Sequence, residues 1–135
     1  MSHLFDTNAI SALVHHRRGY ARLAEKADAV PVAERLISTV TLSELQTMVA
    51  KAADPEAKAA RLQPVLTRFS IVDFDEAAAV HAGQIRAILE PRGLGIGPLD
   101  TLIAAHARSL GAVVVTDNLA EFCRIPGLRV ESWLR

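Results

Sequence analysis

Apolar positions along the chain follow two alternating patterns, short continuous runs and helical spacings. The short runs predict five β-strands, at residues 2–5, 36–40, 69–74, 112–116 and 128–130. Apolar residues spaced three or four positions apart predict helices at 9–14, 20–27, 42–52, 76–90, 99–110 and 119–123, and one more that starts at Asp54-Pro55. Strands that alternate with helices indicate a parallel sheet covered on both faces.

Single residues refine the boundaries and the buried faces of these helices. Asp54 and Asp75 are predicted N-caps, and Pro64 is predicted to break or kink its helix. His81 and His106 fall on apolar stripes, which favours partly buried, hydrogen-bonded core histidines. The buried side of the helix at 99–110 is expected to hold Leu99, Leu102, Ile103 and Leu110.

Composition narrows the classes of protein that fit this pattern. With 135 residues, the chain has the length of one domain, and we expect a single domain over residues 1–135. Half of the residues are apolar, but no run approaches the roughly 20 apolar residues of a membrane span. A single cysteine, Cys123, excludes an internal disulfide and a cysteine zinc cluster. We therefore expect a soluble, cytoplasmic protein.

Four acidic residues far apart in the sequence stand at or just inside helix starts: Asp6, Glu44, Asp100 and Asp117. Three of them follow predicted strands, and in a parallel sheet such positions meet at the carboxyl edge. Two carboxylates about 5 Å apart repel by roughly 3 kcal/mol at an effective dielectric near 20. A hard cation would offset this repulsion, and oxygen ligands without His or Cys suit Mg²⁺ or Mn²⁺. Such a site predicts phosphodiester hydrolysis.

Each acid also has a structural explanation that spacing alone leaves open. Asp6 and Asp117 could cap the helices that follow them, and Asp100 could complement a helix dipole. The segment Thr41-Leu42-Ser43-Glu44 matches a capping box, in which Glu44 would reach back to a backbone amide.

Several motifs occur in an order that matches a known family. They are Leu4-Phe5-Asp6-Thr7-Asn8, Ser43-Glu44-Leu45, the segment 93–107 around Pro98-Leu99-Asp100, Val114-Val115-Thr116-Asp117-Asn118 with Glu121-Phe122, Ile125-Pro126-Gly127-Leu128 and Glu131-Ser132-Trp133. In this order they resemble the PIN-domain family, and within it the VapC-type ribonuclease toxins of bacterial toxin–antitoxin pairs. The resemblance extends over nearly the whole chain.

The resemblance implies a fold and a site. The fold would be an α/β/α sandwich of three layers around a mostly parallel sheet of four to five strands. Asp6 and Asp100 would hold Mg²⁺ or Mn²⁺, with Glu44 binding directly or through water. The fourth acidic position is open: Asp117 ranks above Glu121, while many relatives have the acid where this chain has Asn118. Asn8 and Thr116 would orient the carboxylates by hydrogen bonds.

The resemblance also implies an activity and partners. The expected activity is endoribonuclease cleavage of RNA, with tRNA or another structured RNA as substrate, neutralised by a VapB-type antitoxin. A homodimer is implied, alone or within a larger toxin–antitoxin assembly. The alternative is a non-catalytic PIN-like binding protein that acts through its partner. A phosphatase or phosphoacceptor domain fits less well, because Asn8 stands where a haloacid-type phosphatase needs a second Asp.

Basic residues could supply the RNA contacts. Arg17 and Arg18 form the main cluster with their neighbours, and Arg86 and Arg92 could add to it. The net charge is zero, so RNA attraction would have to come from such a local patch. A solvated polar face remains the alternative interpretation of these arginines.

Overall fold

A single parallel sheet of five strands forms the centre of the molecule, which the computed structural model describes over residues 1–134. The strands are β1 (His3–Phe5), β2 (Arg35–Ser38), β3 (Ser70–Val72), β4 (Val113–Val115) and β5 (Arg129–Glu131). Their order is β3-β2-β1-β4-β5, and every neighbouring pair is parallel. The predicted parallel sheet is therefore confirmed.

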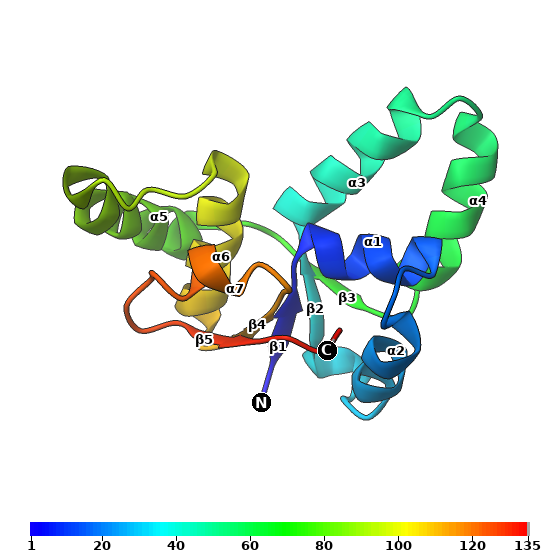
Figure 1. The fold of residues 1–135 in the computed structure, drawn as a ribbon, viewed down its shortest axis with the longest axis horizontal. Helices are drawn as coiled ribbons and strands as arrows, with labels where there is room; N and C mark the ends of the chain where they lie inside the picture. Colours follow the sequence, from blue (N-terminus) through cyan, green and yellow to red (C-terminus); the bar gives the residue numbers. More distant parts are fainter. Residues whose placement is uncertain (135) are drawn as a thin grey trace.

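Helices cover the two faces of this sheet in separate groups (Figure 1). One group consists of α1 (Thr7–His15), α2 (Tyr20–Asp28), α3 (Thr39–Lys51) and α4 (Pro55–Leu66). The other consists of α5 (Glu76–Leu89), α6 (Pro98–Leu110) and the short α7 (Leu119–Phe122). Two 3₁₀ turns, Val32–Glu34 and Glu90–Arg92, complete the described elements. None of the described helices is long and apolar enough to cross a bilayer.

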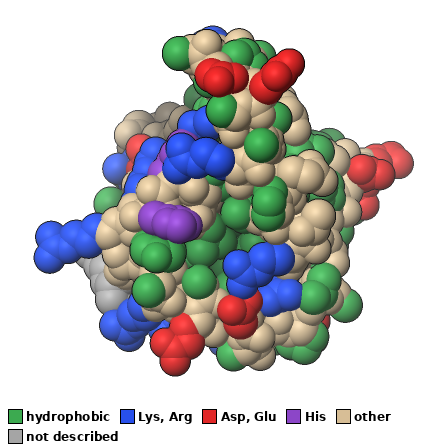
Figure 2. Space-filling view, turned by 90° about the vertical axis from the view of Figure 1, so that its right-hand side faces the viewer, with side chains coloured by type: hydrophobic (Ala, Val, Ile, Leu, Met, Phe, Trp, Pro, Cys, Tyr) green, Lys and Arg blue, Asp and Glu red, His purple; other side chains and the backbone are tan. Residues whose placement is uncertain are grey.

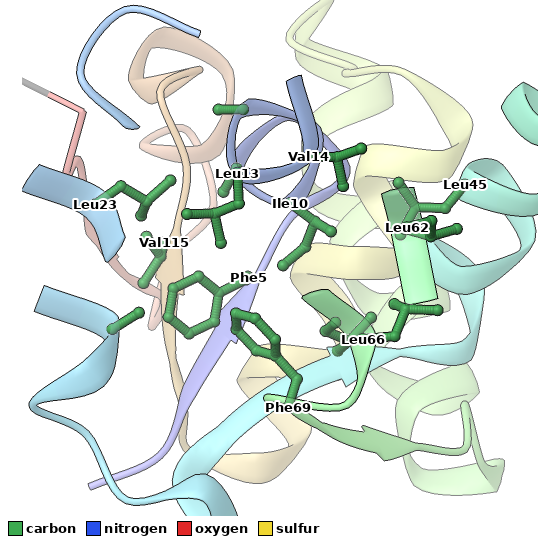
Figure 3. Packing of buried hydrophobic residues seen from close by; sticks show 14 of the residues in the cluster. Phe5, Ile10, Leu13, Val14, Leu23, Leu45, Leu62, Leu66, Phe69 and Val115 are labelled. Carbon is green, nitrogen blue, oxygen red and sulfur yellow. The ribbon is translucent and has the colours of Figure 1, made fainter. Parts of the chain in front are cut away.

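Alternating strand residues feed two hydrophobic cores. Phe5 and Val115 point to the core shared with α1, α2, α3 and α4, where Phe5 packs edge-on against Phe69 (Figure 3). Leu4 and Val114, one residue earlier in each strand, join the core beneath α5 and α6. Successive residues of both central strands therefore point to opposite faces of the sheet. Each face is apolar and is covered by helices, which gives three layers.

The connection between β2 and α3 differs from the predicted one. The helix begins at Thr39, so the predicted strand at 36–40 ends two residues early. Ser38 is the N-cap, and its hydroxyl accepts a hydrogen bond from the Val40 amide at 3.1 Å. The capping box starting at Thr41 is therefore wrong, and Glu44 lies inside the helix with its side chain available for other partners.

Two further predictions about helices are also corrected. Pro64 does not break its helix, because α4 continues to Leu66. Leu99 and Leu110 were expected to be buried, but they are 46% and 44% exposed. Small residues fill the buried side of α6 instead, with Ala104, Ala105 and Ala107 fully buried. Ile103, from the same predicted set, is fully buried as expected and Leu102 is half-buried, so the apolar spacing misplaced only the leucines near the two ends of the helix.

Candidate active site

The order of strands in the sheet reverses between β1 and β4, because β2 and β3 are added on one side of β1 and β4 and β5 on the other. Asp6, the first acid, lies at this switch point. Asp6 directly follows β1 and Thr116 directly follows β4, so adjacent parallel strands deliver both residues to the same carboxyl edge. The Thr116 hydroxyl donates a hydrogen bond of 2.5 Å to Asp6 Oδ2. Asp6 Oδ1 accepts from the Ala9 amide at 2.9 Å, so Asp6 also caps α1. The capping and functional interpretations of Asp6 are therefore compatible.

Burial gives Asp6 an unusual affinity for a proton. Only 1% of this residue is exposed, and burial raises the pKa of Asp6 to about 6 from its ordinary 3.8. The hydrogen bonds from Thr116 and Ala9 lower this pKa, while the negative charges of Asp100 and Glu44 raise it further. The structure therefore brings Asp6, Glu44 and Asp100 together, although 94 positions separate the first and last in sequence.

Glu44 reaches this edge from the second turn of α3. Its Oε1 accepts a 2.6 Å hydrogen bond from the hydroxyl of Thr7, the first residue of α1. The sequence analysis missed Thr7. The available signal was its position between Asp6 and Asn8, which forces its side chain to the same end of α1 as the acid.

Asp100 sits in the first turn of α6 and has a close acidic neighbour. Burial raises the pKa of Asp100, and the charges of Glu121 and then Glu44 raise it further, while a hydrogen bond with the Asn118 amide lowers it. Asn118 also donates to Glu121 Oε2 at 3.0 Å. Its backbone amide bonds to the Thr116 hydroxyl at 2.9 Å. One asparagine thus contacts groups around Asp6, Asp100 and Glu121.

Asp117, which the sequence ranked as the fourth acid, lies in a different setting. Its Oδ1 accepts a hydrogen bond from the Ser132 hydroxyl at 3.0 Å. It lines a hollow of about 540 Å³ together with Asn8, Arg17 and Arg18. The acid that raises the pKa of Asp100 most strongly is Glu121 instead. Glu121 is therefore a candidate for the fourth acidic position beside Asp117.

The predicted basic residues divide between two flanks of the molecule. Arg17 and Arg18 follow α1 and line the hollow with Asp117. Arg86 lies on α5, where its guanidinium pairs with Glu90 at 3.1 Å. Arg92 is exposed in the 3₁₀ turn that follows α5. Because α5 and the α1–α2 connection lie on opposite sides of the sheet in Figure 1, the four arginines do not form one cluster.

The donors at the carboxyl edge are all oxygens, from Asp6, Glu44, Asp100 and Glu121 with hydroxyls and an amide behind them. Within residues 1–134, no three His, Cys, Asp or Glu side chains already surround a common point as a finished metal site does. The acids influence one another electrostatically without a positive side chain between them in the contacts described above. These oxygen donors are of the kind that a hard cation prefers.

Comparison with known proteins identifies the family. A sequence profile of the PIN domain matches residues 4–128. The chain belongs to the PIN domain family. Within the family it is of the VapC type. The tRNA(fMet)-specific endonuclease VapC of Salmonella typhimurium is 48% identical over 97 residues, covering 72% of this chain and 74% of the relative. Ribonuclease VapC2 of Haemophilus influenzae is 34% identical over 99% of both chains.

Solved structures of PIN domain proteins have the same fold. A chain of DNA-bound VapBC from Salmonella typhimurium superposes with a TM-score of 0.91 at 38% identity and 98% coverage of both chains. A chain of promoter-bound VapBC2 from Rickettsia felis gives 0.88 at 36% identity, covering 98% of this PIN domain and 99% of that chain. Both are toxin–antitoxin complexes, so this PIN domain shares its fold with the VapC components of such pairs.

Proposed function

We propose that this PIN domain is a VapC-type endoribonuclease that requires Mg²⁺ or Mn²⁺ and hydrolyses RNA phosphodiester bonds. The observation that carries the proposal is the buried Asp6 carboxyl, whose pKa two other acids raise at the carboxyl edge of the sheet. Structural caps do not need neighbouring acids, whereas a cation site does. The names of the relatives, which are ribonucleases and endonucleases, agree with this choice.

A divalent cation fits the chemistry of this donor set. Asp6 and Asp100 would hold it, and Glu44 would bind directly or through water. When bound, such a cation lowers the pKa of water and stabilises the charge that develops on a phosphodiester undergoing hydrolysis. Mg²⁺ and Mn²⁺ prefer carboxylate oxygens, and both suit a site without imidazole or thiolate donors.

The remaining residues orient the acids. Thr116 and the Ala9 amide fix both oxygens of Asp6, so this carboxylate has one rotamer before any ligand arrives. Thr7 holds Glu44 by one oxygen and leaves the other free to face the site. Asn118 donates to one oxygen of Glu121, and Glu121 also contacts Asp100 through its side chain. We assign Glu121 the fourth acidic place, in which it would position the attacking water or accept its proton.

For the substrate we propose a tRNA, with initiator tRNA as the first candidate. The support is a 48% identical relative that bears the name tRNA(fMet)-specific endonuclease. The test is to incubate the purified protein with a tRNA(fMet) transcript and with total tRNA, in Mn²⁺, in Mg²⁺ and in EDTA, and to map the new 5′ ends. We expect cleavage with 5′-phosphate ends in metal and none in EDTA.

Three matched variants locate the acids in that assay. Asp100→Asn and Glu121→Gln remove a charge while keeping the shape, and each should slow cleavage by at least about 100-fold, as loss of a charged active-site group does. Asp117→Asn makes the same change in the neighbouring hollow and should slow cleavage by less than about tenfold. Metal-dependent cleavage that survives in Asp100→Asn would contradict the proposal. Cleavage-free but correctly folded wild-type protein would instead favour the non-catalytic binding protein.

We also propose that a VapB-type antitoxin neutralises the enzyme by covering the flank formed by α1, α3 and α4. Val14, Leu45, Met48 and Leu62 surround a small apolar pocket there. Figure 2 shows hydrophobic side chains gathered in a hollow on this side of the molecule, with Lys, Arg and His side chains beside it. Co-expression of a cognate VapB-type antitoxin should restore growth to cells that produce this protein. A homodimer remains a prediction, which light scattering on the purified protein would test.

A further inference from the structure

The hollow beside the acids has a chemistry of its own. It measures about 540 Å³ and is lined by Arg17 and Arg18, by the amides Asn8 and Asn118, by Asp117, and by Ala12 and Leu134. Within residues 1–134, the charged side chains in its wall are two guanidinium groups and one carboxylate. The wall is therefore net positive, although the whole chain has a net charge of zero. An anion would be attracted here and not to the surface in general.

The two arginines are available to a ligand. Both side chains are exposed, and among the ion pairs found within residues 1–134 none includes Arg17 or Arg18. Arg35, Arg68 and Arg86, in contrast, each pair with an acid of this chain. Guanidinium groups without an internal partner can bind a phosphate with two parallel hydrogen bonds.

The backbone that carries these arginines is fixed on both sides. His16 ends α1 in the left-handed conformation, with φ of 50°, and the Arg17 amide bonds to the Ala12 carbonyl at 3.0 Å. Gly19 has φ of 86°, and a Cβ there would overlap the carbonyl of Leu134. His16 also stacks on Tyr20, with ring centres 4.3 Å apart. Because this loop is held at both ends, Arg17 and Arg18 lose less conformational entropy on binding a ligand than they would in a flexible loop.

The hollow shares residues with the acidic site. Asn118 lines the hollow, and the same residue contacts Glu121 and Asp100. Asn8, on the opposite wall, lies two residues after Asp6 and next to Thr7, the partner of Glu44. An RNA strand with one phosphate at the acids would therefore pass beside the hollow and bring another of its phosphates to the arginines.

We propose that Arg17 and Arg18 bind a backbone phosphate of RNA next to the one that is cleaved, so that this hollow anchors the strand and sets the length of RNA required. The proposal rests on the ribonuclease function proposed above. It predicts that the arginines act on binding, whereas the acids act on the chemical step. The asparagines would complete the cradle by donating to the sugar–phosphate backbone.

The experiment separates binding from cleavage. RNA binding is measured in the Asp6→Asn background, with the tRNA(fMet) transcript as probe and over a series of salt concentrations. The variants are Arg17→Ala, Arg18→Ala and the double variant. Arg129→Ala is the matched control, because Arg129 starts β5 at the amino edge of the sheet, away from the acids. Arg17→Lys with Arg18→Lys keeps the charge and tests the need for the guanidinium.

We expect the double alanine variant to bind the transcript about tenfold or more weakly, and the slope of log K against log salt to fall by about 0.7, because one contact to a single-stranded phosphate is lost. Arg129→Ala should change neither quantity. With the acids intact, KM should rise and kcat should change little. Substrates trimmed to the two nucleotides of the cleaved bond should be cut equally by wild type and double variant, because they lack the anchored phosphate.

Two outcomes would overturn the proposal. Unchanged RNA affinity and salt slope in the double variant would show that the hollow does not bind RNA, even if the wild-type enzyme cleaves RNA normally. Unchanged RNA binding together with loss of antitoxin binding would assign the arginines to the protein partner. Absence of cleavage by wild type, with RNA binding that still depends on the arginines, would refute the proposed ribonuclease activity and leave the binding site in place.

Discussion

Asp6 joins two roles that usually exclude each other, since it caps a helix as an anion and yet is buried where a proton binds readily. Its pKa of about 6 means that near-neutral pH leaves it partly protonated in the absence of metal. Thr116 and the Ala9 amide hold the anion, and burial opposes them. The residue is therefore close to balance between charged and neutral forms, and a cation would shift that balance toward the charged form.

This balance predicts how stability depends on pH in metal-free protein. The pKa of Asp6 is higher in the folded than in the unfolded chain, so the folded state gains a proton first as pH falls. The resulting stabilisation is present at acidic pH and is lost as pH rises through about 6. Between pH 7.5 and pH 5 it should amount to about 1 kcal/mol.

Urea unfolding in EDTA at the two pH values measures this difference. Asp6→Asn should remove the part due to this residue and leave the protein at least as stable as wild type at pH 7.5. Glu34→Gln, a change at an exposed ion pair with the N-terminus, is the control. Identical pH dependence in wild type and Asp6→Asn would contradict the raised pKa.

At the level of residues, the sequence predicted part of the site. Asp6, Glu44 and Asp100 converge as expected. The fourth acidic position stays a prediction: the sequence ranked Asp117 above Glu121, and in the structure Glu121 is the acid that raises the pKa of Asp100 most strongly. A four-residue helix follows Asn118, and residue spacing cannot show which way it turns the chain. The roles of all these residues in catalysis remain predictions.

The junction of β2 and α3 shows how one element positions the site. Ser38 caps α3 through Val40, and its hydroxyl also lies 2.8 Å from Nδ1 of the buried His106 on α6. Since Glu44 and Asp100 belong to α3 and α6, this serine joins the two helices that carry them. His106 is thus a structural residue, as its apolar stripe predicted, and burial lowers its pKa.

Ser38→Ala should therefore destabilise the fold by about 1–3 kcal/mol, because it removes a cap and leaves the His106 ring nitrogen without its partner. Urea unfolding monitored by circular dichroism provides the measurement. Ser43→Ala is the matched control, since Ser43 is exposed on the same helix. A loss no larger than that of the control would contradict the role given to Ser38.

Helix boundaries were the least predictable part of the elements. Thr39 and Val40 have β-branched side chains that favour a strand, and the hydrogen bond that the Val40 amide donates to the Ser38 hydroxyl overrides that preference. On α6 the exposed Leu99 and Leu110 are more hydrophobic than the buried alanines, so the sequence pattern gave the leucines more weight. Which face of a helix is buried depends on how closely it approaches the sheet, and a single sequence does not contain that distance.

For the whole molecule, the apolar pattern was enough to predict the class of fold. It was not enough to predict which residues meet at the carboxyl edge of the sheet. Alternating patterns were enough for a parallel sheet with helices on both faces. The bond between Asp6 and Thr116 spans 110 positions and exists because β1 and β4 are neighbours, and strand order is not written in the spacing of residues. The ordered motifs of the PIN-domain family, and not the apolar periodicity, predicted that Asp6, Glu44 and Asp100 belong to one site.

The gathered acids predict that metal stabilises the whole domain. A cation that binds only the folded state raises the melting temperature, and the stabilisation reaches about 2.7 kcal/mol at a concentration 100 times Kd. Thermal unfolding with increasing Mn²⁺ at pH 7.5 should show this rise, and a smaller rise at pH 5, where Asp6 is protonated. Asp100→Asn should lose most of the effect, while Asp117→Asn should keep it. Equal melting temperatures with and without Mn²⁺ would contradict a cation site.

The place of β4 in the sheet also has a consequence for synthesis. β1 is made long before β4, its second neighbour in the sheet, which has Thr116 and Asn118 after its end. A nascent chain that stops before β4 already contains Asp6, Glu44 and Asp100 and cannot yet align them. The arrangement of acids proposed to bind metal therefore forms only after β4 has been made, and we expect a nascent chain that stops before β4 to lack the proposed ribonuclease activity.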